Sequence, residues 1–336
     1  MANPILVELT RGNLVESIHR GSIAIAKADG TLTVSLGDVE APVYPRSSLK
    51  PIQALPLVES GAAEAFHLSD EEVALACASH SGEPMHTERV AAWLQRLGLS
   101  EADLACGPHA VRYEPVWRQM VAKGEAPSRL HNNCSGKHAG FLTLAKFLGA
   151  PTAGYERHDH PVQQAAARAL SELAGVDADM PWGVDGCAAP NYAIPLAAFA
   201  RALAKLAEPS ALPAPRAAAA RRIVKAMSTY PELVSGTGRA CAVLMRAGRG
   251  RVTVKTGAEG VYAGIVPELG LGIALKIDDG AGRASETVIA ALLEKLGLLH
   301  GDAAATALIR QPITNTRNAV AGEQRPAAVL ANLVLA

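Results

Sequence analysis

The sequence has few aromatic residues and no excess of charge of either sign. Aromatic side chains make up 4% of the 336 residues, and 32 basic side chains balance 32 acidic ones. Proteins that bind nucleic acids usually carry a basic excess, and those that bind single strands also stack bases on aromatic rings. Docking on an acidic membrane surface needs positive charge as well. We therefore expect neither nucleic acid nor membrane among the partners.

Long apolar runs and a disulfide framework are also missing. No stretch approaches the ~20 apolar residues that cross a bilayer, and Glu8 and Glu16 interrupt the first segment, which lacks the pattern of an export signal. The cysteines are odd in number and widely spaced: Cys77, Cys106, Cys134, Cys187 and Cys241. Such a set is typical of a reduced protein and contains no C-x-x-C pair for a zinc ribbon. We expect a cytoplasmic protein.

Segments with strand character lie at both ends of the chain, and helical segments lie between them. Strands are expected at 5–10, 15–26, 31–36, 241–246, 251–255, 260–266 and 271–277. Helices are expected at 47–60, 69–77, 86–97, 135–148, 161–174, 193–206, 217–227 and 284–296. This order predicts a mixed α+β fold, with an antiparallel sheet assembled from N- and C-terminal strands and flanked by helices.

The whole chain is expected to form one domain over residues 1–336. Its sheet subregion would comprise about 1–60 and 235–336, and its helical subregion about 61–234. The segment 301–336 contains no motif that we can interpret.

The first candidate for chemistry is Ser47 with Lys50, three residues apart at an expected helix start. This spacing places both side chains on one helix face. A serine hydroxyl becomes a nucleophile when a base removes its proton, and a buried lysine can act as that base. Taken alone, the pair is more often a helix cap and a solvated lysine.

A second element strengthens that hypothesis. Lys255, Thr256 and Gly257 end an expected strand. An early S-x-x-K on a helix and a late K-T-G on a strand resemble the arrangement of penicillin-binding proteins and serine β-lactamases. The lysine would supply positive charge or a second base, and the glycine would let a substrate approach the strand edge. The two motifs together predict a serine–lysine amidohydrolase.

Four other polar segments are ambiguous on their own. Residues 77–83 contain Ser79 and Ser81, either of which could be a second hydroxyl of the site, although this stretch alone favours a helix-ending loop. Residues 131–138 crowd Cys, Lys and His at a helix start, which would suit an anion, a perturbed thiol or a metal. Residues 182–187 contain Asp185 and Cys187, but Cys187 is too far from Cys134 in the sequence for the two to pair as in a zinc ribbon. Residues 155–161 carry an H-x-H pair, but Pro161 favours a helix cap there.

Six segments taken together resemble the L-asparaginase II family of the inducible rhizobial type. They are Arg46–Pro51, Cys77–Ser81, Asn133–Gly140, Asp159–Pro161, Gly183–Cys187 and Lys255–Gly260. The resemblance extends over nearly the whole chain. It implies a fold similar to serine β-lactamases and serine glutaminases, hydrolysis of the side-chain amide of L-asparagine to aspartate and ammonia, and a homodimer.

The resemblance also implies roles for individual residues. One Ser–Lys pair would be Ser47 with Lys50, and the other Ser79 with Lys255. Zinc, one ion per chain, would be held by Cys134, Lys137 and Cys187, and would support substrate binding more than the chemical step. The substrate would be held by Arg46, His138 and Asp185. A lysine ligand must be neutral to bind metal, so metal affinity would depend on pH.

The predicted reaction is acyl transfer through a covalent β-aspartyl-enzyme. Lys50 would take the proton of Ser47, which attacks the amide carbon, and backbone N–H groups near the helix start would stabilise the oxyanion. Ammonia would leave with a proton from Ser79 or Lys255, and water would hydrolyse the ester. Two alternatives stay open: a glutaminase or β-lactam-reactive acyl hydrolase on the same scaffold, and a non-catalytic protein that binds an amino acid or zinc.

Overall fold

The computed structural model describes residues 2–335, which divide into two compact units. Within the described chain, the sheet unit comprises residues 2–48, 194–208 and 243–335. The helical unit comprises residues 49–193 and 209–242. Strands from both ends of the chain lie in the sheet unit, as the sequence predicts. That the whole chain is a single domain stays a prediction.

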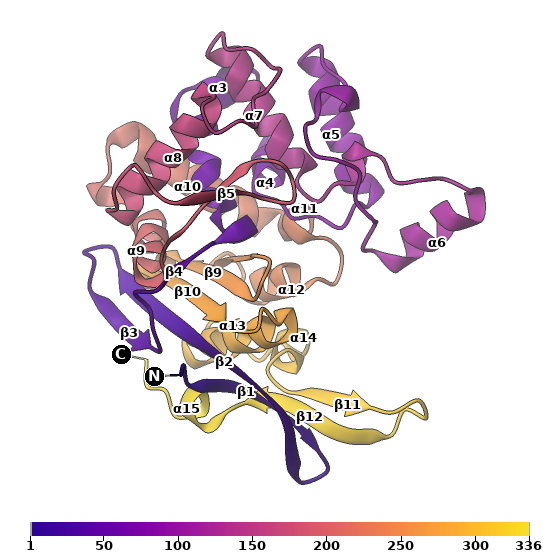
Figure 1. The fold of residues 1–336 in the computed structure, drawn as a ribbon, viewed down its shortest axis with the longest axis vertical. Coiled ribbons are helices and arrows are strands. Elements are labelled where there is room, and N and C mark those ends of the chain that lie inside the picture. The colour runs from indigo at the N-terminus through magenta and orange to yellow at the C-terminus, as the bar shows by residue number, and fades with distance from the viewer. Residues whose placement is uncertain (1, 336) are drawn as a thin grey trace. The chain divides into compact units, whose positions relative to one another are not determined.

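An eight-stranded antiparallel sheet organises the sheet unit (Figure 1). Its strands are β1 (Ile5–Arg11), β2 (Leu14–Lys27), β3 (Leu32–Leu36), β8 (Thr253–Thr256), β9 (Val261–Val266), β10 (Leu271–Ile277), β11 (Gln311–Thr314) and β12 (Val320–Pro326). Their order is β11-β12-β1-β2-β10-β9-β8, and β3 pairs with β2. Every pairing is antiparallel. The predicted α+β class and the assembly of the sheet from both ends of the chain are confirmed.

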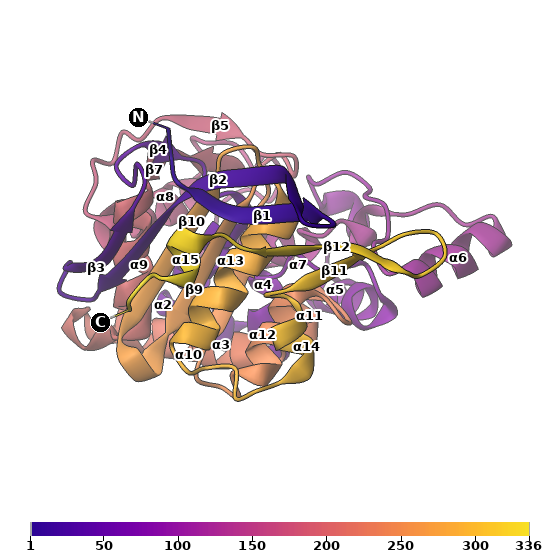
Figure 2. The same ribbon diagram turned by 90° about the horizontal axis from the view of Figure 1, so that it is seen from below.

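Helices cover both faces of the centre of this sheet, as Figure 2 illustrates from below. Helix α9 (Leu196–Ala207) packs on β2, β9 and β10, and α13 (Gly282–Lys295) packs on β1, β9, β10 and β12. A Cβ on Gly272 would meet the α9 backbone, whereas one on Gly264 would meet Ile289 of α13. Because both faces are covered, all six residues of β9 are buried. This explains its continuous apolar sequence.

Shorter elements complete the sheet unit. They are β4 (Pro42–Val43), which pairs with β7 (Ile194–Pro195), and η5 (Pro267–Leu269), α14 (Ala303–Ala307) and α15 (Ala328–Ala331). The segment 301–336, which has no recognisable motif, thus supplies two strands to the sheet within its described part.

Two predicted elements are wrong. Residues 241–246 were expected to form a strand but lie in helix α12 (Ala240–Ala247). An apolar run this short has no decisive period, and its Ala, Leu, Met and Arg residues favour a helix. The continuous helix expected over 47–60 is instead split into η1 (Arg46–Leu49), α1 (Lys50–Gln53) and α2 (Leu55–Glu59). Both α1 and α2 have a proline in their first turn, where its missing N–H is tolerated.

The helical unit packs its remaining helices around a second core. These are α3 (Ala62–Ala65), α4 (Asp70–Ala76), α5 (Pro84–Arg96), α6 (Glu114–Lys123), α7 (Ser135–Phe147), α8 (Pro161–Ala174), α10 (Ala214–Thr229) and α11 (Pro231–Ser235). Short elements are η2 (Glu101–Asp103), η3 (Arg129–His131), η4 (Pro209–Ala211) and the hairpin β5 (Trp182–Val184) with β6 (Pro190–Tyr192). Across residues 2–335, no helix combines the length and apolar character that a membrane crossing requires.

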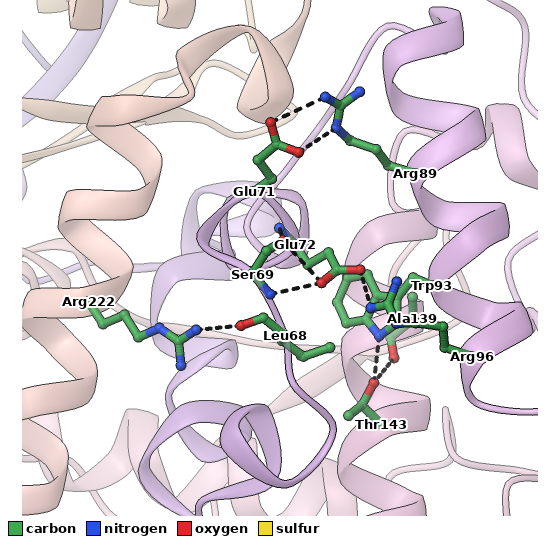
Figure 3. A network of polar contacts seen from close by, with 10 residues as sticks. All are labelled: Leu68, Ser69, Glu71, Glu72, Arg89, Trp93, Arg96, Ala139, Thr143 and Arg222. Atoms are coloured by element: carbon green, nitrogen blue, oxygen red, sulfur yellow. Dashed lines mark hydrogen bonds and ion pairs between the residues drawn. The ribbon is translucent and has the colours of Figure 1, made fainter.

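Side-chain polar contacts fix the start of α4, which leads to the Ser79 loop (Figure 3). A capping box is present: the Ser69 hydroxyl accepts the Glu72 N–H, and the Glu72 carboxylate accepts the Ser69 N–H at 2.9 Å. Arg96 of α5 also donates to Glu72. On the neighbouring turn, Arg89 donates to both oxygens of Glu71. These pairs tie α4 to α5.

Two buried histidines stack beside the same loop. The rings of His80 and His86 lie 4.8 Å apart at an angle of 9°. Backbone N–H groups of Gly82 and Glu83 donate to their Nδ1 atoms, so each neutral ring carries its proton on Nε2. Burial lowers the pKa of both rings, and the mutual repulsion of their charged forms lowers that of His80 further.

The unfolding free energy should therefore fall in mild acid. Unfolded imidazoles bind protons below a pKa of about 6.5, whereas folded His80 and His86 do not, so acid favours unfolding by up to about 1.4 kcal/mol per pH unit for each ring. Urea titrations at about pH 7.5 and about pH 5 measure the effect. The His80→Gln variant should lose less stability between the two pH values than the wild type. An equal or larger loss in that variant would contradict this account.

The central sheet should tolerate an added methyl group at Gly264 of β9 but not at Gly272 of β10. A Cβ at Gly272 would lie 2.2 Å from Ala200 O and from Ala204 N, which are backbone atoms that cannot give way. We expect Gly272→Ala to lower the unfolding free energy by about 3 kcal/mol, which is typical of overpacking. Gly264→Ala is the matched control, since its Cβ would meet only side-chain carbons at 3.3 Å or more. Urea unfolding of both variants checks the order.

Candidate active site

The residues predicted to carry chemistry fall into two groups, one in each unit. Arg46, Ser47 and Lys255 belong to the sheet unit. The others belong to the helical unit: Lys50, Ser79, Cys134, Lys137, His138, Asp185 and Cys187.

In the sheet unit, the turn that carries Ser47 lies against the end of the K-T-G strand. Ser48 donates from Oγ to the carbonyl of Pro45 at 2.6 Å, which closes the turn. A Cβ on Gly257 would lie 2.6 Å from that carbonyl and 3.4 Å from the Ser48 nitrogen. Only glycine permits this close approach, which accounts for the glycine of the K-T-G motif.

The side chains of this group differ in exposure. Lys255 is 1% exposed and donates from Nζ to the carbonyl of Thr256 at 2.8 Å. Ser47 is half-buried, and Arg46 has a φ of 53°, in the left-handed region. A non-glycine residue in this conformation stores backbone strain, which is common at functional turns. The sheet unit thus holds a half-buried hydroxyl and a buried amine on adjoining segments.

The centre of the second group is the buried amine of Lys50. This residue is 1% exposed, and its Nζ lies 3.0 Å from Ser79 Oγ and 3.1 Å from Cys134 Sγ. It also donates to the carbonyl of Ala78. Sequence spacing had suggested Ser47 as the partner of Lys50; the hydroxyl found beside its amine within the helical unit is Ser79.

The backbone holds Ser79 in place from two sides. Its own N–H donates to the carbonyl of Val234 at 2.8 Å, and the next N–H, of His80, donates to the carbonyl of Asn133 at 3.2 Å. Ser79 therefore lies between the loop that ends α11 and the turn that starts α7. Because Cys134 follows Asn133 directly, the same contacts bring the Ser79 loop next to the thiol.

A buried carboxylate joins these loops further along. Glu83 is 5% exposed and accepts hydrogen bonds from Ser81 Oγ at 2.5 Å, Thr237 N at 2.9 Å and Thr237 Oγ1 at 2.6 Å. Burial alone would raise the pKa of Glu83, but these hydrogen bonds outweigh it and hold the pKa below its usual value. A charged carboxylate with three donors fixes the loop that carries Ser79 to the loop that follows α11.

A cluster of two thiols and a second buried amine lies next to Lys50. Lys137 Nζ is 3.1 Å from Cys187 Sγ, and Cys187 is hydrogen-bonded to Cys134. The hydrogen bond from Cys134 and the charge of Lys137 lower the pKa of Cys187 to about 4, against the effect of burial. The same thiol–thiol bond, together with burial, raises the pKa of Cys134 to about 12. The thiol–thiol bond thus favours ionisation of Cys187 over that of Cys134.

This donor set suits a thiophilic metal ion. Two cysteine sulfurs and one nitrogen are ligand types that zinc takes. Burial alone would lower the pKa of Lys137, but Cys187, Cys134 and Asp185 outweigh it and hold its pKa above the usual value. A metal ion would have to displace that proton. Among residues 2–335, no three His, Cys, Asp or Glu side chains cluster as a metal site, so any site here depends on the lysine.

Asp185 and His138 lie beside this cluster in the helical unit. Asp185 is half-buried in a turn closed by Ala188 N–H to its carbonyl at 2.8 Å, and Ala188 has a φ of 73°. His138 is fully buried, and its Nδ1 lies 2.6 Å from the Tyr155 hydroxyl. Burial, and then the nearby charge of Lys137, lowers the pKa of His138 to about 3.

Sequence reasoning missed three contacts of this group: Lys50 with Ser79, Glu83 with Thr237, and Tyr155 with His138. Each joins segments that are distant along the chain, and no motif spacing encodes them. Tyr155 precedes the polar segment 156–161, where a helix cap was expected instead of a metal site. That cap is confirmed, since His160 accepts the Val162 N–H at 3.2 Å.

Solved structures similar to this chain include a protein designated Mglu and a β-lactamase. Mglu in its native form has a TM-score of 0.46 and 18% identity, over 84% of this chain and 66% of that chain. Its tris and glutamate form has a TM-score of 0.48 and 18% identity, over 89% of this chain and 64% of that chain. A β-lactamase from Burkholderia ambifaria gives 0.38 and 18%, over 80% and 90%. This chain thus spans slightly less than two thirds of Mglu. No curated protein matches the sequence.

A family model gives the decisive comparison. The model of L-asparaginase II matches residues 7–326, which is nearly the whole chain and includes every candidate residue of both groups. The chain therefore belongs to the L-asparaginase II family.

Proposed function

We propose that this protein hydrolyses the side-chain amide of L-asparagine to L-aspartate and ammonia. The observation that carries the proposal is the contact between Lys50 Nζ and Ser79 Oγ, 3.0 Å apart and both buried, in a chain of the L-asparaginase II family. A hydroxyl within hydrogen-bond reach of an amine is the arrangement that nucleophilic catalysis requires.

The surroundings of Lys50 suit a base. A neutral amine has two N–H groups and one lone pair. Its N–H groups can donate to the Ala78 carbonyl and to Cys134 Sγ, which leaves the lone pair for the Ser79 hydroxyl. In this arrangement Lys50 accepts the hydroxyl proton, whereas sequence spacing suggested that it does so for Ser47.

The proposed reaction then has two balanced halves. Ser79 Oγ forms a bond to the amide carbon as its proton moves to Lys50 Nζ, and the C–N bond breaks as that proton passes to the leaving ammonia. Water then attacks the β-aspartyl ester, gives a proton to Lys50 and releases Ser79, which recovers that proton. Ser47 and Lys255 are the second hydroxyl and amine that the reaction requires, and Arg46 would bind the substrate.

Three further features belong to the proposal. Cys134, Lys137 and Cys187 would hold one zinc ion, which when bound supplies a positive charge that attracts an oxygen of the substrate. Asp185, as a carboxylate, would pair with the substrate's α-ammonium group, and His138 would contact the same substrate. The protein would act as a cytoplasmic homodimer.

Removing either partner of the buried pair should abolish turnover. We expect Ser79→Ala and Lys50→Met to lower kcat for asparagine by roughly a thousandfold or more, as the loss of a nucleophile or its base does in other hydrolases. Ser47→Ala should show a similar loss. A coupled ammonia assay measures all three. The control is Ser285→Ala, since Ser285 is also a buried serine and its hydroxyl, within the described chain, donates to the Gly282 carbonyl of its own helix. Turnover of Ser79→Ala above a tenth of wild type would contradict the assignment.

Substrate comparison separates the proposed reaction from its alternatives. The same assay with glutamine, and a chromogenic β-lactam measured in parallel, should give much lower kcat/KM than asparagine. If glutamine or the β-lactam is turned over as fast as asparagine or faster, that compound and not asparagine is the preferred substrate. If neither asparagine nor glutamine releases ammonia, the remaining alternative is a non-catalytic protein that binds an amino acid or zinc.

Zinc removal should weaken substrate binding more than catalysis. We expect about one zinc per purified chain, since three N/S ligands with one open position are typical of functional zinc sites. Treatment with a chelator should raise KM more than it lowers kcat, and added zinc should reverse the change. Elemental analysis should find no zinc in Cys187→Ser. The control is Cys106→Ser, which should keep the zinc because Cys106 is buried but is not one of the three proposed ligands. Full activity in metal-free protein would contradict this role.

A further inference from the structure

His138 has one satisfied ring nitrogen and one that has no partner. It lies in α7, is 0% exposed, and follows Lys137 directly. Its Nδ1 is 2.6 Å from the Tyr155 hydroxyl, whereas its Nε2 has no hydrogen-bond partner in the described chain. A buried polar atom without a partner is costly and calls for an explanation.

The contacts of Tyr155 determine the direction of the first hydrogen bond. The backbone N–H of Ala105 donates to the Tyr155 oxygen at 2.9 Å. That oxygen carries a single proton, and its other contact is His138 Nδ1. If Nδ1 also donated, two N–H groups would meet one oxygen and the hydroxyl proton would have no acceptor. The satisfied arrangement therefore has Tyr155 donating to Nδ1.

Tyr155 is itself held rigidly enough to impose this arrangement. Its side chain is 1% exposed, and its ring packs edge-on against the His138 ring with centroids 5.4 Å apart. Its backbone carbonyl accepts a hydrogen bond from Gln163 Nε2 at 2.9 Å. Contacts at both ends of the residue leave the hydroxyl little freedom to turn away from His138.

We propose that Tyr155 is a positioning residue that fixes His138 as the tautomer with its proton on Nε2. The unpartnered Nε2–H is then a permanent donor, so the group that His138 contacts in a complex must be a hydrogen-bond acceptor. This inference rests on the proposed function and extends it, because it states which end of the substrate His138 can hold.

The assignment separates the two groups expected to hold the substrate. A carboxylate such as Asp185 can only accept hydrogen bonds, and it therefore suits an ammonium group. An imidazole Nε2–H can only donate, and it therefore suits a carboxylate or carbonyl oxygen. His138 also interacts electrostatically with Lys137 and Lys50, the amines of the same cluster. Asp185 and His138 would thus recognise opposite ends of a zwitterionic amino acid.

Nitrogen NMR measures the tautomer directly. The chain contains 10 histidines, and the resonances of His138 are those lost in the His138→Gln variant of ¹⁵N-histidine-labelled protein. We expect the wild type to show the neutral form protonated on Nε2, and Tyr155→Phe to show a different or mixed tautomer. Protonation on Nδ1 in the wild type, or an unchanged spectrum in Tyr155→Phe, would overturn the inference.

Kinetics test whether Tyr155 acts through His138. We expect Tyr155→Phe to lower kcat/KM for asparagine about tenfold, as loss of a supporting hydrogen bond at a functional histidine typically does. In a His138→Gln background, the same substitution should change kcat/KM less than about twofold, because the residue it positions is gone. Losses that simply multiply would show that Tyr155 acts independently and would overturn the inference.

Tyr192→Phe is the matched control. Tyr192 is also a buried tyrosine, but its hydroxyl has no partner among the described residues, so its removal should leave the His138 spectrum and the activity unchanged. A wild-type protein that releases no ammonia from asparagine would refute the proposed function. The tautomer measurement would still decide the inference in that case, since it does not depend on turnover.

Discussion

The burial of the Lys50 amine constrains the helical unit more than any other interaction. An ammonium or amine removed from water must find polar partners, or its burial costs several kcal/mol. Lys50 finds three: a backbone carbonyl, a hydroxyl and a thiol. Those partners come from the end of α4 and the start of α7, so satisfying one amine requires that both segments meet. The bonds of Ser79 to Val234 and of Glu83 to Thr237 then add the loop after α11.

The fold was largely predictable because its strands and helices carry local signals. The Asp29-Gly30 sequence is typical of a hairpin turn and lies between β2 and β3, and the capping box from Ser69 to Glu72 marks the start of α4. Where the local signal is weak, the prediction failed. Residues 241–246 are apolar at nearly every position, and only packing decides between strand and helix there. The two strands after residue 301 are rich in polar residues, and the pairing of β12 with β1, far away in the sequence, is a tertiary effect.

The candidate site was predictable in its parts but not in its contacts. S-x-x-K and K-T-G are readable because their spacing is local, and the glycine of K-T-G has a clear reason in the close approach of the Pro45 carbonyl. The pairing of Lys50 with Ser79 is not local, since it depends on how α4 ends and on which carbonyls receive the loop's N–H groups. The two thiols lie far apart in the sequence, so spacing gave no reason to pair them. Only the family resemblance predicts that Cys134 and Cys187 share a site.

Buried polar groups in this chain differ in whether all their polar atoms have hydrogen-bond partners. This difference distinguishes groups that fix loops from a group that can bind a ligand. Glu83 and His80 have hydrogen-bond partners on their polar atoms, and these two groups fix loops. His138 is different, because one ring nitrogen is fully engaged and the other is unpartnered. Gln163, Tyr192 and Arg251 also have an unpartnered atom in the described chain. Of these four residues, His138 is the one that directly follows Lys137, whose amine contacts Cys187. A ligand held by that cluster can accept the hydrogen bond of the open donor, which gives a reason for the donor to be kept.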